Sequence, residues 1–366
     1  MRDKFDHGTR GIIGMLLKLD AASINKCVRC GTCRSVCPVF EESGYESANT
    51  RGRILVMKGL QEGLEADADV LDSLNTCTTC GLCTDICPAG VNPPEMIETA
   101  RRELVSQGAM TTEQALLSAN IFTSGNTFGD PRQRQAWLED RSLLKEKADY
   151  VYFVGCMNSY RYQETAAKTF DLLRRFGVTL LPSEQCCGSP LLRTGFDAGR
   201  FIKDNMEQIY RIGAHTIITG CAGCYTTLKK SYPADLQILS VPEFLAEHIH
   251  ELDLKHLDLT VTYHDPCHLG RHNKIYEPPR RVIEAICHLR EMKTNRQNAR
   301  CCGGGGGVRS GYRDLSLKMA TRRLNDIPYG VDFVVTSCPL CIRNLRDAGE
   351  ADRVIDLVDL VAKSIN

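Results

Sequence analysis

The chain beyond residue 148 alternates short apolar runs with longer amphipathic stretches. Runs rich in β-branched and aromatic residues predict strands, and apolar positions spaced three and four apart predict helices. The expected order is a strand at 150–154, a helix at 165–176, a strand at 178–181, a helix at 197–212 and a strand at 216–219. A similar order returns, with strands at 259–263 and 333–336 and helices at 279–290 and 313–325. The repeat predicts two α/β halves, each a small parallel sheet with packed helices, in a pseudo-twofold arrangement.

The residues before this repeat are expected to be mainly helical. Residues 38–76 form a helix-rich segment, and residues 53–60 carry its clearest apolar face. Helical patterns with polar, Pro and Gly interruptions continue to residue 147. We therefore expect four parts: a helical domain at 1–100, a helical linker at 101–148, and α/β halves at 149–256 and 257–366.

The longest apolar run near the N-terminus, at residues 11–17, is soon interrupted by Lys18 and Asp20. It is far shorter than the ~20 apolar residues of a membrane span, and no secretory cleavage site follows it. The sequence therefore predicts a cytoplasmic chain without a membrane span of its own. Any association with a membrane would come through a partner subunit.

Composition directs attention to the cysteines. The 366 residues include 45 Lys and Arg and 45 Asp and Glu, and a net charge of zero argues against a nucleic-acid-binding protein. Nineteen cysteines accompany a single Trp, and in a reducing compartment such cysteines indicate metal or catalytic chemistry. No G-x-G-x-x-G follows a predicted strand and no Walker motif occurs, so electrons would come from another subunit.

Eight cysteines form two copies of C-x-x-C-x-x-C-x-x-x-C-P, the bacterial ferredoxin spacing for [4Fe–4S] cubane clusters. In that spacing the fourth cysteine of each run binds the other cluster. We therefore expect one cubane on Cys27, Cys30, Cys33 and Cys87, and the other on Cys77, Cys80, Cys83 and Cys37. Two zinc sites are the alternative, but zinc normally takes cysteines in two pairs. The N-terminal domain is thus expected to be ferredoxin-like and to conduct electrons.

Each α/β half carries five further cysteines in the order C, C-C-G, C-x-x-C. The first set is Cys156, Cys186, Cys187, Cys221 and Cys224, and the second is Cys267, Cys301, Cys302, Cys338 and Cys341. In both sets the first and fourth cysteines follow predicted strands, and ligands of parallel sheets bind at such strand ends. Five thiolates on three loops can converge on one cofactor.

Each five-cysteine set resembles the CCG domain of heterodisulfide reductases. The whole chain resembles the fused catalytic subunit of that family, in which two ferredoxin motifs precede two CCG domains. The resemblance includes the segments at 186–193 and 264–271. It implies that each set binds a noncubane [4Fe–4S] cluster, and that a disulfide, such as the coenzyme M–coenzyme B heterodisulfide, is cleaved between the two clusters.

This chemistry is consistent with the residues. Splitting a disulfide takes two electrons and leaves two thiolates. Electrons from a flavoprotein, a membrane cytochrome b, or a hydrogenase or formate dehydrogenase module would pass singly through the cubanes. Two clusters facing one cleft can each deliver one electron and capture one sulfur, which is our hypothesis for the presence of two complete sets.

Several other residues lie close to these cysteines. His264 and His268 are candidates either for protonating departing thiolates or for ordering their loop through hydrogen bonds. The glycine run at 303–307 can direct backbone N–H groups to sulfur or simply provide flexibility. Three arginines can bind an anionic substrate or form surface ion pairs: Arg193, Arg271 and Arg309.

The chain also resembles the iron–sulfur subunits of glycolate and lactate oxidases, notably at Arg51-Gly52-Arg53. This resemblance implies an alternative, an electron conduit for a flavin-dependent dehydrogenase without a substrate site of its own. The intact Cys338-x-x-Cys341 pair favours disulfide chemistry, because this pair is often incomplete in that branch. A zinc-loaded scaffold is a third class.

Overall fold

The computed structural model describes residues 21–365, which form two compact units. Unit 1 contains the described residues up to Ala119 together with two later segments, Pro190–Asp197 and Gly303–Met319. Unit 2 contains Asn120–Ser189, Ala198–Cys302 and the described residues from Ala320 onward. The two later segments of unit 1 interrupt unit 2, so both units are discontinuous along the chain. Each of these segments lies at or just after a C-C-G sequence. The contiguous division into four domains stays a prediction.

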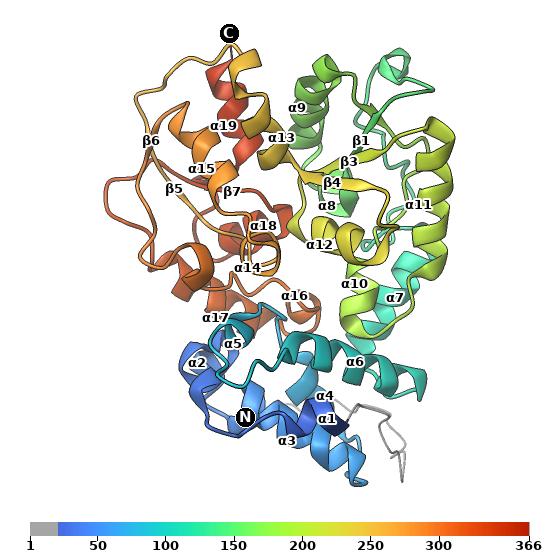
Figure 1. Cartoon of the computed structure of the whole chain (residues 1–366), viewed down its shortest axis with the longest axis vertical. Coiled ribbons are helices and arrows are strands. Elements are labelled where there is room, and N and C mark those ends of the chain that lie inside the picture. The colour runs from blue at the N-terminus through green and yellow to red at the C-terminus, as the bar shows by residue number, and fades with distance from the viewer. Residues whose placement is uncertain (1–20, 366) are drawn as a thin grey trace. The chain divides into compact units, whose positions relative to one another are not determined.

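The described part of unit 1 is helical (Figure 1). Its N-terminal helices are α1 (Ala21–Asn25), α2 (Pro38–Ser43), α3 (Thr50–Gln61), α4 (Ala68–Asn75), α5 (Leu82–Asp85), α6 (Pro93–Ser106) and the start of α7 (Thr112–Ser124). The later segments contribute most of α10 (Ser189–Thr194), α16 (Val308–Gly311) and the start of α17 (Arg313–Leu324).

Side-chain caps and apolar faces explain the two central helices of unit 1. The Asn49 side chain accepts hydrogen bonds at the start of α3, and Asp67 accepts one at the start of α4. Met57 and Leu60 of α3 are fully buried with Leu74 of α4 in one apolar cluster. The predicted helix at 53–60 is therefore confirmed as part of α3, whose buried face holds the unit together.

Unit 2 contains two four-stranded parallel sheets. The first has the order β2-β1-β3-β4, from β1 (Tyr150–Phe153), β2 (Thr179–Leu180), β3 (Thr216–Thr219) and β4 (Gln237–Ser240). The second has the order β6-β5-β7-β8, from β5 (Thr260–Tyr263), β6 (His288–Leu289), β7 (Phe333–Thr336) and β8 (Val354–Asp356). The repeated strand order confirms the duplication of a parallel α/β sheet.

Helices connect the strands of each sheet in unit 2. Those of the first half are α8 (Gly155–Tyr160), α9 (Gln163–Leu173), α11 (Gly199–Ile212), α12 (Ala222–Ser231) and α13 (Val241–Glu247). Those of the second are α14 (Gly270–Asn273), α15 (Glu277–Glu284), α18 (Pro339–Asp347) and α19 (Leu357–Ser364), with the end of α17. Among residues 21–365, no helix is long and apolar enough to cross a membrane, and the run at 11–17 lies outside these residues.

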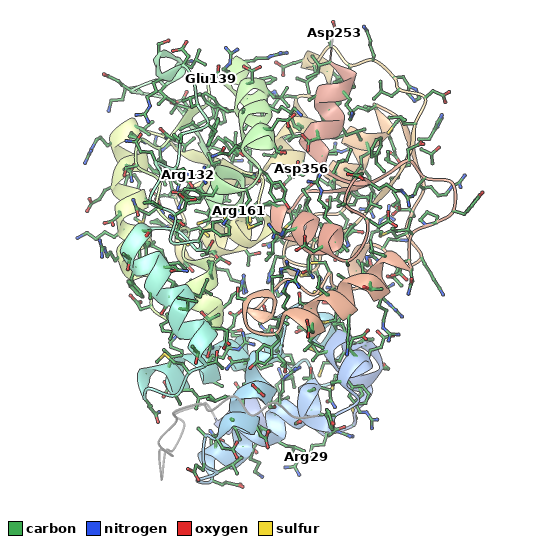
Figure 2. The ribbon with its side chains drawn as sticks, turned by 180° about the vertical axis from the view of Figure 1, so that it is seen from behind. Arg29, Arg132, Glu139, Arg161, Asp253 and Asp356 are labelled. Atoms are coloured by element: carbon green, nitrogen blue, oxygen red, sulfur yellow. The ribbon has the colours of Figure 1, made fainter. Side chains whose placement is uncertain are left out.

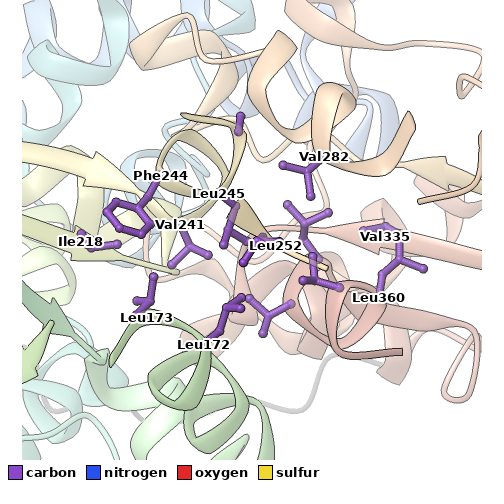
Figure 3. Packing of buried hydrophobic residues seen from close by; sticks show 14 of the residues in the cluster. Leu172, Leu173, Ile218, Val241, Phe244, Leu245, Leu252, Val282, Val335 and Leu360 are labelled. Carbon is purple, nitrogen blue, oxygen red and sulfur yellow. The ribbon is translucent and has the colours of Figure 1, made fainter. Parts of the chain in front are cut away.

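One apolar core joins the two halves of unit 2. Helix α13 packs against α15 and α9 packs against α19 (Figure 1). Figure 3 shows the cluster between them, in which Leu173 and Phe244 of the first half share buried space with Leu360 of the second. Because burial of such side chains stabilises each by roughly 1.5–3 kcal/mol, the halves support one another.

The helix expected at 279–290 is partly wrong. Helix α15 ends at Glu284, and His288 pairs with Thr260 as part of β6. Apolar residues in this short segment fit either structure, and pairing with β5 decides it. Strands β4 and β8 were not expected, because each is short and leads directly into a capped helix. Ser240 caps α13, and Asp356, labelled in Figure 2, caps α19.

Close backbone contact explains part of the glycine run in unit 1. Gly303, Gly306 and Gly307 all have positive φ angles. A Cβ atom on Gly306 would overlap the carbonyl oxygen of Cys77, so the backbones meet too closely for any side chain. These positions therefore serve local geometry and packing rather than simple flexibility.

Replacement of Gly306 by Ala should destabilise unit 1 strongly. Gly44 is the matched control, because its φ is +73° but a Cβ atom added there would meet nothing within 4 Å. We expect Gly44→Ala to cost about 1 kcal/mol through backbone strain, and Gly306→Ala to cost roughly 3 kcal/mol or more through overlap. Thermal unfolding of anaerobically purified protein measures both. Equal melting temperatures of Gly306→Ala and Gly44→Ala would contradict the explanation that the Gly306 and Cys77 backbones approach too closely for a side chain.

Candidate functional site

The two ferredoxin-type motifs in unit 1 share an unusual backbone. The residue before the second cysteine has a positive φ in both copies, 58° at Arg29 (Figure 2) and 51° at Thr79. The glycine after that cysteine, Gly31 or Gly81, has a φ of 82°. Alternating right- and left-handed residues turn backbone N–H groups inward and make anion-binding concavities. Such a loop suits the negatively charged sulfur of a cluster.

Two cavities in unit 1 collect the cysteines of these motifs. The first is lined by Cys27, Cys30, Cys33 and Cys87, and also by Cys83, which lines both cavities. The second is lined by Cys37, Cys77, Cys80 and Cys83. The fourth cysteine of each motif thus lies with the first three of the other, which is the arrangement that cubane ligation requires. The donor chemistry and the cavities fit two cubanes, although ligation itself stays a prediction.

The two cavities differ in exposure. Cys30 of the first is exposed, and the hydroxyl of Thr32 lowers the pKa of its thiol through a hydrogen bond. Cys37 and Cys80 of the second are both buried, and burial raises the pKa of Cys37. The first cavity is therefore the one nearer to solvent within unit 1.

Arg101 ties the second cavity to both later segments of unit 1. The Arg101 side chain is 1% exposed. Its guanidinium donates hydrogen bonds to the carbonyl oxygens of Leu74 (2.6 Å), Cys77 (2.8 Å), Arg193 (2.7 Å) and Gly306 (2.9 Å). A guanidinium has five N–H donors in a fixed fork, so one side chain can fix all four backbone segments. Arg193 and Gly306 follow the CCG motifs of the first and second halves.

Unit 2 brings the ten other motif cysteines together. Cys156 follows β1 and Cys221 follows β3, while Cys267 follows β5 and Cys338 follows β7. All four thus lie beyond the carboxyl ends of central strands, where parallel sheets bind ligands. All nineteen cysteines of the chain lie among the described residues, and none of them is joined in a disulfide bond.

Hydrogen bonds between thiols connect the two five-cysteine sets. In the first half they link Cys156 to Cys186, Cys186 to Cys187, Cys187 to Cys224 and Cys224 to Cys221. In the second, Cys338 contacts Cys341, and the Sγ atoms of Cys341 and Cys302 are 3.3 Å apart. Cys221 also hydrogen-bonds to Cys338, so the two sets adjoin within unit 2.

These contacts favour a thiolate at one position in each half. Hydrogen bonds from Cys186 and Cys224 lower the pKa of Cys187 to about 6, and hydrogen bonds from Cys221 and Cys341 lower the pKa of Cys338. Metal ligation requires the thiolate form. A group of buried thiolates repels itself unless cations neutralise it, so the donor set fits an iron-containing cofactor.

A buried ion pair adjoins the first set. Arg134 lies 3.4 Å (Nη2) and 3.5 Å (Nη1) from the Cys156 sulfur and 3.1 Å from Glu184. Glu184 also accepts hydrogen bonds from the backbone of Val154 and Gly155, and burial raises its pKa to about 7. The contacts place positive charge beside Cys156. The sequence carries no motif at Arg134, and only the proximity of Glu184 to the C-C-G sequence could have drawn attention to it.

His264 adjoins the second set. Arg323 Nε donates a hydrogen bond of 3.0 Å to His264 Nδ1. Burial and then the charge of Arg323 lower the pKa of His264 to about 3, so the ring is neutral. The neighbouring cation opposes the charged form of the ring, and transfer of a proton by His264 stays a prediction.

His268 is 7% exposed, and its ring stacks on His272 with centroids 4.5 Å apart. Its carbonyl oxygen accepts hydrogen bonds from Thr226 and Asn273. These contacts fit the role of ordering the loop after Cys267. Transfer of a proton by His268 stays a prediction.

Two of the three candidate arginines are engaged within the protein. Arg271 is 4% exposed and donates hydrogen bonds to the carbonyl oxygens of Gln297 and Ala299, which precede Cys301. Arg193 pairs with Glu98 in unit 1 at 2.7 Å. These contacts favour the ion-pair and structural interpretation for Arg193 and Arg271, and binding of an anionic substrate by them stays a prediction. Arg309 is half-buried, and its role stays a prediction.

The fold and sites define an iron–sulfur protein of the oxidoreductase class. A 4Fe-4S dicluster domain matches residues 23–91, and the cysteine-rich CCG domain matches residues 150–229 and 261–346. The chain is 34% identical to the D subunit of the dihydromethanophenazine:CoB–CoM heterodisulfide reductase of Methanosarcina acetivorans, over 96% of both chains. It belongs to the family of iron–sulfur proteins formed by these heterodisulfide reductase D subunits.

Other relatives have different names. The B subunit of the fumarate reductase (CoM/CoB) of Methanothermobacter marburgensis is 32% identical over 92% of this chain and 71% of its own length. EtfAB:quinone oxidoreductase of Syntrophomonas wolfei is 26% identical over 94% of this chain and 59% of its own. The same architecture therefore occurs in several oxidoreductases.

Exchange of single cysteines tests the crossed cubane ligation. We expect Cys87→Ser to perturb the same paramagnetic centre as Cys30→Ser, and Cys37→Ser the same centre as Cys80→Ser, because each pair lines one cavity. Electron paramagnetic resonance of the reduced, anaerobically prepared protein measures this. Cys287→Ser is the control, because Cys287 lies in the apolar core. Pairing of Cys37 with Cys30 would contradict the assignment.

Proposed function

We propose that this chain is the disulfide-reducing subunit of a heterodisulfide-reductase-type complex. One observation carries the proposal: both five-cysteine sets are complete, and they adjoin through Cys221 and Cys338. A disulfide has two sulfur atoms that must separate, and two adjacent sites of the same kind can receive one each. The heterodisulfide reductase relatives, matched over nearly their full length, support this assignment.

The cofactors we propose are two cubane and two noncubane [4Fe–4S] clusters. The cubanes would occupy the two cavities of unit 1, and the noncubane clusters the two five-cysteine sets of unit 2. Such clusters, when bound, supply single electrons and iron sites with affinity for sulfur. The sets would face each other about the pseudo-twofold axis that the repeated strand order suggests.

The overall reaction takes a disulfide, two electrons and two protons to two thiols. This chain's residues hold the cysteines in place and offset their charge. Arg134 does so at Cys156, whereas Asp265 orders the loop of Cys267 through a bidentate contact with buried Arg280, at 2.8 and 3.0 Å. The protons would come from solvent or from the candidate donors His264 and His268, and the low pKa of His264 favours His268.

Exposure suggests the direction of electron flow. Electrons would enter at the cavity with exposed Cys30 and leave from the cavity of buried Cys37 and Cys80. The backbone of Cys77 in that second cavity contacts Gly306, which follows Cys302 by only four residues along the chain. The second cavity therefore adjoins, within unit 1, a segment that follows the second CCG motif along the chain, and we propose that electrons leave unit 1 from this cavity.

The partners we propose are an electron-donating subunit and a small-molecule disulfide. The donor would be a flavoprotein, a membrane cytochrome b, or a hydrogenase or formate dehydrogenase module. We propose that the chain works in the cytoplasm, and that contact with a membrane would come through the donor. The name of the relative in Methanosarcina acetivorans includes dihydromethanophenazine, which supports a reductase with a separate electron source.

A second candidate is an electron conduit for a flavin-dependent dehydrogenase, such as one acting on glycolate or lactate. The relative named EtfAB:quinone oxidoreductase favours this candidate, because its name mentions a quinone and no disulfide substrate. The Arg51-Gly52-Arg53 sequence does not discriminate, since packing explains it. Arg53 donates to the Ser73 carbonyl, and a Cβ on Gly52 would overlap the Glu46 backbone.

Viologen-linked reduction of the coenzyme M–coenzyme B heterodisulfide under anoxia distinguishes the two functions. We expect turnover by the iron-loaded wild-type protein, and a loss of about 100-fold or more in both Cys187→Ala and Cys302→Ala, because each half receives one sulfur. Cys287→Ala should retain activity. Full turnover in Cys187→Ala or in Cys302→Ala would contradict the proposal that each half receives one sulfur of the disulfide. An inactive, fully loaded wild-type protein would favour the conduit.

A further inference from the structure

We propose that His264 is a positioning residue whose neutral imidazole donates its Nε2–H to sulfur at the second five-cysteine set. The inference rests on the proposed function, because it assumes that this set holds an iron–sulfur cluster. It assigns to His264 a role in setting the reduction potential of that site. Proton transfer to substrate plays no part in it.

The backbone fixes His264 at the end of the central strands of the second sheet. It directly follows β5, and its N–H donates to the carbonyl of Val335 in β7 at 2.9 Å. Its own carbonyl accepts a hydrogen bond of 2.9 Å from the hydroxyl of Thr336. The ring therefore projects from two paired strands rather than from a free loop. One ring nitrogen and the Sγ atoms of Cys302 and Cys341 lie within 4.8 Å of one another.

Arg323 determines which ring nitrogen carries the proton. A guanidinium N–H can only donate, so Nδ1 of His264 must accept from Arg323 Nε. A neutral imidazole with an accepting Nδ1 carries its hydrogen on Nε2. Arg323 is itself held by the Thr294 carbonyl at 2.8 Å and by Asp326 at 2.7 Å. The tautomer of His264 is thus set by a fixed and fully buried cation.

The Nε2–H group lacks a partner within the described part of the chain. His264 is 1% exposed, and Nε2 has no hydrogen-bond partner there. The Nη2 group of Arg323 is likewise buried without one. Leaving a buried donor unsatisfied costs about 1–3 kcal/mol, so such groups indicate an acceptor that binds at the site. Cluster sulfur beside Cys302 and Cys341 would be such an acceptor.

The same hydrogen bond argues against His264 as an iron ligand. Ligation through Nε2 needs a lone pair on that nitrogen, and Nδ1 already accepts from Arg323. Both nitrogens would then lack a proton, leaving an imidazolate. Histidine ligands normally donate their second N–H to an acceptor, the reverse of this contact. His264 therefore acts as a donor to the site, while the five cysteines supply its ligands.

A hydrogen bond to sulfur stabilises the reduced, more negative state and raises the reduction potential. The two five-cysteine sets have different neighbouring residues. The residues at the end of β1, Phe153 and Val154, have no polar side chain, and the charged Arg134 contacts Cys156 instead. At the first site a cation contacts a cysteine sulfur directly, whereas at the second a neutral ring lies beside the sulfurs and the cation Arg323 contacts that ring, so the potentials of the two sites should differ.

Two substitutions separate the functions of the ring nitrogens. His264→Asn retains an acceptor near Nδ1 for Arg323 but removes the donor at Nε2. His264→Gln places an amide N–H near Nε2. We expect His264→Asn to shift the midpoint potential of one centre to more negative values, with the ratio of reduced to oxidised centre at fixed potential falling about fivefold. His264→Gln should recover most of this shift.

An anaerobic redox titration followed by electron paramagnetic resonance measures the shift, and iron content and thermal unfolding are measured on the same samples. His288→Asn is the matched control, since His288 is exposed on β6. Iron content should be equal in all variants. An unchanged potential in His264→Asn, or loss of iron that His264→Gln does not restore, would overturn the inference. If the potential shifts in iron-loaded His264→Asn but the iron-loaded wild-type protein does not reduce the disulfide, the inference about His264 stands and only the proposed function is overturned.

Discussion

The burial of many cysteine sulfurs beside one another is the constraint on which the rest of this structure depends. In unit 2, two parallel sheets direct the loops after their central strands to the same region, where Cys221 of one half contacts Cys338 of the other. Thiolates packed in this way repel one another unless positive charge is close. Iron can supply most of that charge, and the protein supplies Arg134 beside Cys156. With the proposed clusters bound, the duplicated fold and the cofactor would be interdependent: the sheets bring the cysteines together, and iron would offset the repulsion between their thiolates.

Unit 1, which is helical, also brings cysteines close together, in the loops of its two ferredoxin-type motifs. Its cysteine loops adopt left-handed residues at equivalent positions, which makes two concave backbones of the same shape. The buried guanidinium of Arg101 then fixes the Cys77 loop to backbone segments that follow both CCG motifs along the chain. An electron-transfer module needs fixed geometry between neighbouring centres. Within unit 1, one side chain with five donors fixes these backbone segments without a further apolar core.

Much of this organisation was predictable because it rests on local spacing. The C-x-x-C-x-x-C runs identified the cavities of unit 1, and the apolar runs before Cys156, Cys221, Cys267 and Cys338 located strand ends. The rest depends on contacts distant in sequence. Arg101 reaches Gly306 across 205 positions, and Arg323 reaches His264 across 59. Single buried arginines leave no periodic signal, so neither contact could be inferred. The sequence left open whether His264 protonates a thiolate or orders its loop, because the cation that contacts its ring is remote in sequence.

Under the proposed function, both five-cysteine sets hold iron in addition to the two cubanes. Iron determination on the anaerobically prepared full chain, with 57Fe Mössbauer spectroscopy on the same sample, tests it most directly. Four clusters of four irons predict about sixteen iron atoms per chain, with cluster types beyond the cubane. About eight iron atoms, all in cubane form, would show that the duplicated module binds no cluster and would contradict the account.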